Sequence, residues 1–434
     1  MRLTRGGMSG ACGRCDERSR GAAASGGGAP RALIDETRCF VAVAFLMLGS
    51  ASFAQTTSPP LPSVAAIQVG PVSVFPSINL HDIGFDSNIF NEFPQQRDDF
   101  TFTVTPRVQT AVRLGAARLV GTSSGDFVYY QTYKDQQSVN GMFDGRFELV
   151  SERLRPYVSA GRLRTRDRTG FEIDARARRL ETNITAGLDL NVTSITALTA
   201  RVRRDDQAYG QAERFLGVNL GEQLDHTSEL AAAGVKLALT PLTTMTIAGE
   251  VQQDRFKTSP LRNADSVRVA PAIEFAPDAT LTGRASAGYR QFKPLDPRLP
   301  QYRGFVASAG VGYSLLGVTH FDVQANRDVT YSLDPSQPYY LAFGGRVAVS
   351  QRLVGPFDLI VLGSRERLRY QPLGGTSLEG RVETTTSIGG GVGVHVGEHL
   401  SFTLTYERTE RLSSEPDRRD YHRRRMLGSV NYGL

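Results

Sequence analysis

The sequence predicts a closed antiparallel transmembrane β-barrel of about eighteen strands, preceded by a cleaved signal peptide and a short proline-rich linker. Three observations predict this fold. Apolar and polar residues alternate with a period of two along most of the chain, short turns alternate with longer polar loops, and no cysteine follows Cys39. A secreted chain of this length without disulfides needs another source of closure, and a barrel supplies it because every strand has two partners.

The first 54 residues are typical of a secretory targeting segment. Arg38 precedes an apolar run that begins at Cys39 and ends with Ser52 and Ala54 at the −3 and −1 positions. This layout predicts cleavage after Ala54. The run is too short for a spanning helix. A buried core helix is the alternative, but nothing downstream indicates a helical domain that would bury it.

Two further regions follow the signal. Residues 55–70 are rich in proline and predict an extended periplasmic linker, and residues 71–434 predict one outer-membrane β-barrel. In 99–114 the even positions are mostly apolar and the odd positions mostly polar, and 182–190, 267–275 and 400–406 repeat the pattern. The first of these strands is much longer than the five or six residues usual in soluble sheets.

The connections predict the strand count. We expect short turns near residues 115–117, 152–154, 191–194, 240–243, 276–279, 315–317, 352–355 and 397–399. We expect loops near 86–98, 134–140, 166–176, 207–222, 257–265, 293–302, 332–337, 372–380 and 412–420. Eight turns and nine loops require eighteen strands, and both termini then lie on the short-turn, periplasmic side. A soluble β-sandwich or propeller is the alternative, but its strands would be shorter or its blades would repeat.

Two features fit a barrel less well. Pro106 and Pro271 lie inside predicted strands, where a closed sheet has no free edge for a residue without an N–H. The strand 358–369 has apolar residues on both faces, which leaves sixteen strands as an alternative count.

Strand parity places a nearly balanced set of arginines and acids on the inner face. The lumen-lining candidates are Arg107, Arg113, Arg146, Arg162, Arg164, Arg179, Arg201, Arg203, Arg268, Arg284, Arg346, Glu148, Glu181, Glu250 and Asp322. Such a balance predicts a highly charged wall without a net preference for anions. Two interpretations remain open, a transverse field across an aqueous channel and a ladder of salt bridges that satisfies buried charge.

Two short segments carry a family resemblance. Gly428, Val430, Tyr432 and Leu434 alternate to the end of the chain and resemble the terminal-strand signal read by the barrel-assembly machinery. Residues 80–90, LHDIGFDSNIF, resemble the opening G-[YF]-D-x-N-[VI]-[FY] signature of the putative β-barrel porin 2 family, and the overall layout is similar from about residue 70 to 434. The resemblance implies an outer-membrane barrel, with some members linked to exopolysaccharide production or export.

These patterns predict a porin-like channel of the bacterial outer membrane, for small hydrophilic solutes or for polysaccharide, without cofactor, metal or covalent chemistry. Its expected partners are outer-membrane lipid and the barrel-assembly machinery, and the modest net charge of +6 does not favour nucleic acid. An outer-membrane lipid hydrolase is one alternative, because Gly121–Gly125 matches G-x-S-x-G, but that motif requires a strand–turn–helix. A structural or adhesive barrel is another. An inward fold of the loop 207–222 is expected from Phe215 and Leu216.

Overall fold

The computed structural model describes residues 67–277, 279–374, 380–397, 399–415 and 419–433. The predicted signal peptide, most of the predicted linker and Leu434 lie outside the described residues. The last linker residues form a short strand, β1 (Ile67–Val69), which pairs with the start of β2.

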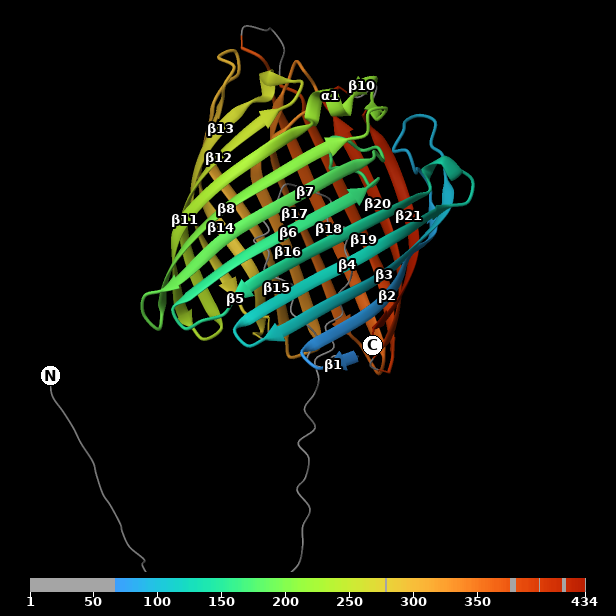
Figure 1. Cartoon of the computed structure of the whole chain (residues 1–434). Helices are drawn as coiled ribbons and strands as arrows, with labels where there is room; N and C mark the ends of the chain where they lie inside the picture. Colours follow the sequence, from blue (N-terminus) through green and yellow to red (C-terminus); the bar gives the residue numbers. More distant parts are fainter. Residues whose placement is uncertain (1–66, 278, 375–379, 398, 416–418, 434) are drawn as a thin grey trace, which may run out of the picture. The chain divides into compact units, whose positions relative to one another are not determined.

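Eighteen long strands form one closed antiparallel barrel (Figure 1). They are β2 (Val72–Asp86), β3 (Asp99–Leu114), β4 (Ala117–Tyr130), β5 (Ser138–Leu149), β6 (Leu154–Thr165), β7 (Arg179–Asn191), β8 (Thr196–Tyr209), β11 (His226–Thr240), β12 (Thr243–Phe256), β13 (Ala264–Phe275), β14 (Leu281–Pro294), β15 (Tyr302–Leu315), β16 (Thr319–Tyr331), β17 (Tyr339–Arg352), β18 (Phe357–Gln371), β19 (Val382–Val396), β20 (Leu400–Ser413) and β21 (Tyr421–Gly433). Each strand pairs with its sequence neighbours, and β2 pairs with β21 to close the sheet. The predicted fold and strand number are therefore confirmed.

The connections separate into two rims, as predicted. Short turns join β3 to β4, β5 to β6, β7 to β8, β11 to β12, β13 to β14, β15 to β16, β17 to β18 and β19 to β20. We call this end of the barrel the turn rim. Longer loops form the opposite end, the loop rim, which also carries the small elements η1 (Lys134–Gln136), β9 (Arg214–Phe215), β10 (Val218–Asn219), α1 (Leu220–Leu224) and η2 (Pro260–Arg262). None of the helices in the described part of the chain is long and apolar enough to cross a membrane.

Contacts between non-adjacent strands identify the concave face of the sheet. Arg268 on β13 and Arg290 on β14 both form ion pairs with Asp328 on β16, at 3.3 and 2.7 Å, across the intervening strand β15. In a barrel, side chains so far apart along the sheet meet only on its concave side. The cross-strand register then assigns each strand's remaining residues to the concave or the convex face.

The two prolines are accommodated by local gaps in strand pairing. Between β3 and β4 the register lapses from Val104 to Arg107, on either side of Pro106. Between β13 and β14 it lapses from Val269 to Ala272, around Pro271. Each proline pairs on its other side, so one missing N–H removes a short stretch of one ladder and the barrel stays closed.

The strand with ambiguous facing is also resolved. In β18, Ile360 and Leu362 are buried on the concave face, whereas Leu359 and Val361 are 43% and 53% exposed on the convex face. Apolar side chains therefore lie on both faces of this part of β18. The count of eighteen therefore holds, and sixteen is excluded.

Candidate functional site in the barrel lumen

A loop that crosses the barrel mouth is the main feature of the interior. Residues 166–178, between β6 and β7, are here called the crossing loop. Glu172, Ile173 and Ala177 in this loop are at most 4% exposed. Loops normally run over the surface, because buried backbone needs polar partners. The crossing loop finds its partners on strands and loops far along the sheet.

Glu172 fastens the crossing loop to the opposite wall. Its carboxylate accepts hydrogen bonds from the Ser332 hydroxyl at 2.6 Å and from the Leu333 backbone N–H at 3.0 Å, both in the loop between β16 and β17. Arg381, which directly precedes β19, lies 3.6 Å from the same carboxylate. Burial raises the pKa of Glu172, and the bond from Ser332 offsets part of that rise.

Asp174 makes a second attachment. Its carboxylate accepts a hydrogen bond from the Asn91 side chain at 2.5 Å and pairs with Arg168 at 3.2 Å and with Arg411 of β20 at 3.5 Å. The crossing loop therefore contacts the β2–β3 loop on one side and β20 on another. Its acidic residues provide countercharges for arginines that project from the wall.

These attachments surround a buried carboxylate at the start of β19. Glu383 is 1% exposed and pairs with Arg381 at 2.9 Å, Arg411 at 2.5 Å and Arg419 at 3.0 Å. The Tyr370 hydroxyl donates to it at 3.0 Å. One acid and three guanidinium groups thus form a dense network, in which removal of the acid would leave several buried positive charges.

The opposite side of the crossing loop is apolar. Ile173 and Ala177 pack with Leu220 and Leu224 of the loop 210–225, here called the cap loop. The loop expected to fold inward does pack against the crossing loop, and the side chains that make this contact are Leu220 and Leu224. Phe215 packs only partly against this cluster and Leu216 is 41% exposed, so the two residues that motivated the expectation contribute least.

Arg262 ties the cap loop to the neighbouring loops. It is 1% exposed and donates to the Ser332 carbonyl at 2.7 Å and to the Gln223 side chain at 2.6 Å. Burial lowers its pKa to about 10. The mouth at the loop rim is therefore held by specific hydrogen bonds as well as by apolar packing.

The register places most of the predicted lumen residues on the concave face. These are Arg107, Arg113, Arg146, Arg179, Arg201, Arg203, Arg268, Arg284, Arg346, Glu148, Glu181, Glu250 and Asp322. Several are brought together as ion pairs, including Arg201–Glu250 at 2.5 Å, Arg146–Glu148 at 3.1 Å and Arg179–Glu181 at 2.5 Å. Much of the charge on this wall is therefore paired in cross-strand or same-strand bridges.

The prediction for Arg162 and Arg164 is wrong. Arg162 pairs with Phe143, which is 55% exposed on the convex face, and both arginines share that face with Val158. The even residues of β6 are apolar from Leu154 to Ala160, and Arg162 and Arg164 continue the same convex face, where charged side chains are not expected.

Two arginines of β3 differ from the rest of the concave set. Arg107 and Arg113 have no carboxylate within ion-pair distance among the described residues, and Arg107 lies opposite Ser77 and Ser124. An arginine of this kind retains donors for a passing anion.

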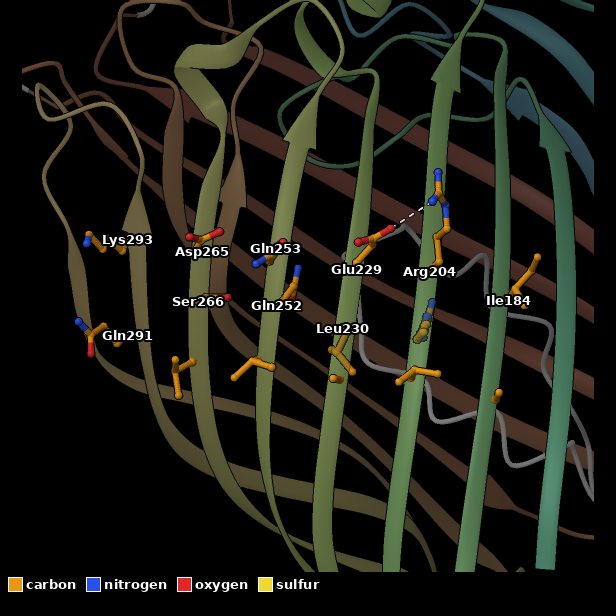
Figure 2. A pocket seen from close by; sticks show the side chains of 16 residues that line it. Ile184, Arg204, Glu229, Leu230, Gln252, Gln253, Asp265, Ser266, Gln291 and Lys293 are labelled. Carbon is orange, nitrogen blue, oxygen red and sulfur yellow. Dashed lines mark hydrogen bonds and ion pairs between the residues drawn. The ribbon is translucent and has the colours of Figure 1, made fainter.

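The convex face carries a shallow hollow of about 740 Å³ across β7 to β14 (Figure 2). Figure 2 shows Arg204 and Glu229 directed toward each other above the apolar part of this hollow, with their charged groups 3.1 Å apart. Ser123, of the G-x-S-x-G match, also lies on the convex face, within β4 and opposite Val108. It is not on a strand–turn–helix.

Similar solved structures include the outer membrane protein opdK from Pseudomonas aeruginosa, with 9% identity, a TM-score of 0.46 and coverage of 83% of this chain and 99% of that chain. A BenF-like porin from Pseudomonas fluorescens Pf-5 has 10% identity, a TM-score of 0.46 and coverage of 84% and 100%. Pseudomonas aeruginosa OccK2 (OpdF), in complex with glucuronate, has 10% identity, a TM-score of 0.46 and coverage of 83% and 98%.

No curated protein sequence matches the chain. The family model described as Putative beta-barrel porin 2 matches residues 62–432, which is most of the sequence and nearly all of the barrel. The chain belongs to the Putative beta-barrel porin 2 family of outer-membrane, porin-like barrels.

Proposed function

We propose that this barrel is a passive channel through which small hydrophilic solutes cross the outer membrane, and that the crossing loop sets its limiting width. The supporting observation is that Glu172 and Asp174 fix this buried loop to Ser332, Asn91 and Arg411, on parts of the wall several strands away from β6 and β7. The turn rim, with both ends of the barrel sequence, faces the periplasm in this proposal.

The composition of the concave face supports an aqueous path. Three of the four apolar clusters among the described residues contain side chains at the loop rim, and the fourth, Phe75, Ala111 and Val120, lies near the turn rim. Between them the wall carries ion pairs and small residues, such as Gly389, Gly391 and Gly393 of β19, together with the buried Ile360 and Leu362 of β18. Barrels of about sixteen to eighteen strands enclose more space than such side chains fill.

Small solutes fit this interior better than a polymer. A polysaccharide in transit would occupy the mouth continuously and would have to displace the crossing loop from Ser332 and Arg411. A small solute needs a narrower path than a polymer does. Arg107 and Arg113 favour anionic solutes in this proposal, because their guanidinium groups lack protein carboxylates among the described residues.

Liposome swelling with solutes of graded size tests the proposal. Liposomes that contain the purified barrel should swell in iso-osmotic small sugars and amino acids, and should not swell in iso-osmotic dextran. Equal exclusion of all solutes would contradict a channel, and rapid entry of dextran would instead support polymer passage. Lipid hydrolysis that is lost in S123A would support the enzyme alternative.

A further inference from the structure

Four strands change from apolar to basic at one level of the convex face. Toward the loop rim, the convex side of β18 changes from Phe357, Leu359 and Val361 to three successive arginines. On the other three strands a single arginine follows apolar residues, and the next residue of the same parity is Val329 on β16, Glu410 on β20 and His422 on β21. We call the resulting set the arginine face: Arg327 on β16, Arg365, Arg367 and Arg369 on β18, Arg408 on β20 and Arg424 on β21.

The cross-strand register shows that this boundary is level. Arg327 is in the row of Phe343 and Arg367, one row nearer the loop rim than Arg365. Arg408, which pairs with Arg424, is one row further toward the turn rim than Arg365. Strands in a barrel are tilted against the membrane normal, so residues that pair across strands lie at different depths in the membrane. Residues at one depth are therefore shifted by some positions from each strand to the next. The change from apolar residues to arginine is shifted between strands in this way, as we expect at a membrane interface.

The arginine face has no ion-pair partner among the residues that the structure describes, and all of its arginines except Arg327 are exposed. Glu410, an acid on the same convex face, lies 3.5 Å from His422. The hollow across β7 to β14 is different, because Arg204 pairs with Asp206 and Glu229 there, and Arg255 pairs with Asp265.

We propose that the arginine face binds the phosphorylated headgroup of an outer-leaflet glycolipid. Guanidinium groups bind phosphate through paired hydrogen bonds, and the apolar residues directly below would contact the acyl chains of the same molecule. The loop rim lies at the cell surface in outer-membrane barrels, which places the arginines at the level of outer-leaflet headgroups. A second copy of the chain is a poorer occupant, because a twofold interface would bring the same arginines together.

The test measures binding of bis-phosphorylated lipid A to the full-length barrel in neutral detergent. The test variant is R365Q/R367Q. The matched control is R204Q/R255Q, which removes two convex-face arginines that already have carboxylate partners. We expect the test variant to bind lipid A about tenfold to thirtyfold more weakly, at roughly a factor of five per arginine. The control should stay within about twofold of the wild type, and monophosphorylated lipid A should bind the wild type more weakly.

Both variants are first checked for folding by heat-modifiable gel mobility, so that loss of binding reports the surface. If R365Q/R367Q fails to fold, R369Q/R424Q replaces it, since these side chains are also exposed and unpaired. Equal lipid A affinity in wild type and test variant would overturn the proposal. It would also be overturned if neutral lipid bound equally well, or if the wild type associated into dimers that R365Q/R367Q dissolves. None of these outcomes depends on channel activity.

Discussion

The Glu172 carboxylate, in a loop that begins after β6, accepts a hydrogen bond from the Ser332 hydroxyl, in a loop that begins after β16, at 2.6 Å. The two residues are 160 positions apart in the sequence. This contact joins the crossing loop to the far wall and turns a surface connection into part of the barrel interior. The state of the mouth should therefore depend on this bond.

The first prediction concerns removal of that bond. E172A deletes the acceptor for Ser332 and Leu333 and the partner of Arg381. Bonds to a charged group contribute roughly 1.5–3 kcal/mol, so the closed position of the crossing loop should become about tenfold or more less favoured. Single-channel recordings should show a larger or noisier conductance. E222A, in the exposed part of the cap loop, is the control and should leave the conductance unchanged.

The second prediction concerns pH. Because burial raises the pKa of Glu172, the closed loop binds a proton more tightly than an open, solvated loop does. Protonation of Glu172 therefore stabilises the closed loop. This stabilisation is fully present below pH 4.5, the ordinary pKa of a glutamate, and is lost as pH rises through the raised pKa of Glu172. Burial would raise the pKa of Asp334, but hydrogen bonds from Ser336 and Arg381 lower it below its ordinary value. The stabilisation that ionised Asp334 gives to its loop is therefore lost only at more acidic pH.

Conductance should therefore increase from about pH 4.5 toward neutrality, and E172Q should flatten this part of the profile. A profile that is the same in wild type and E172Q would assign the dependence to another group. Far-ultraviolet circular dichroism across the same range shows whether the barrel stays folded.

The third prediction concerns ion selectivity. R107Q removes a concave-face guanidinium that has no carboxylate partner among the described residues, so the ratio of chloride to potassium permeability should fall severalfold. Reversal potentials in a salt gradient measure this ratio. R203Q, the control, removes an arginine already paired with Asp205 at 2.6 Å and should change the ratio less. An equal shift in both variants would mean that total wall charge decides selectivity.

The fourth prediction concerns stability. E383Q leaves Arg381, Arg411 and Arg419 without their shared carboxylate in a site that is almost fully buried. Breaking a buried ion network of this kind should lower the free energy of unfolding by about 3–5 kcal/mol. E274Q disrupts a looser pair with Arg284, at 3.9 Å and about a third exposed, and should cost less than about 1 kcal/mol. Urea titrations in lipid vesicles compare the two.

The two-residue period accounts for how much of this structure the sequence predicts. It places Arg201 and Glu250 on the concave face and sets the strand count, because parity and turn spacing are local properties. The prediction fails at Arg162 and Arg164, because the apolar, convex face of β6 ends in two arginines and charged residues are expected in the lumen. The arginine face also follows the period, but charged residues on the convex side do not resemble a lipid-facing strand.

The crossing loop could not be predicted in this way. Its sequence, RDRTGFEIDARAR, is polar and is typical of a solvated loop. It is buried because Arg381 and Arg411, more than 200 residues later, supply countercharges to Glu172 and Asp174. Only the closed barrel brings these groups together.

Single-channel recording of a loop-shortened variant in planar bilayers tests the central claim most directly. Replacement of residues 169–175 by a short Gly-Ser linker removes Glu172 and Asp174 and keeps β6 and β7 joined. The wild type should show steady ionic conductance, and the variant should conduct more with a folded barrel. Absence of conductance in both, from protein that is folded by gel mobility, would contradict a channel, and equal conductance in both would contradict a limiting crossing loop.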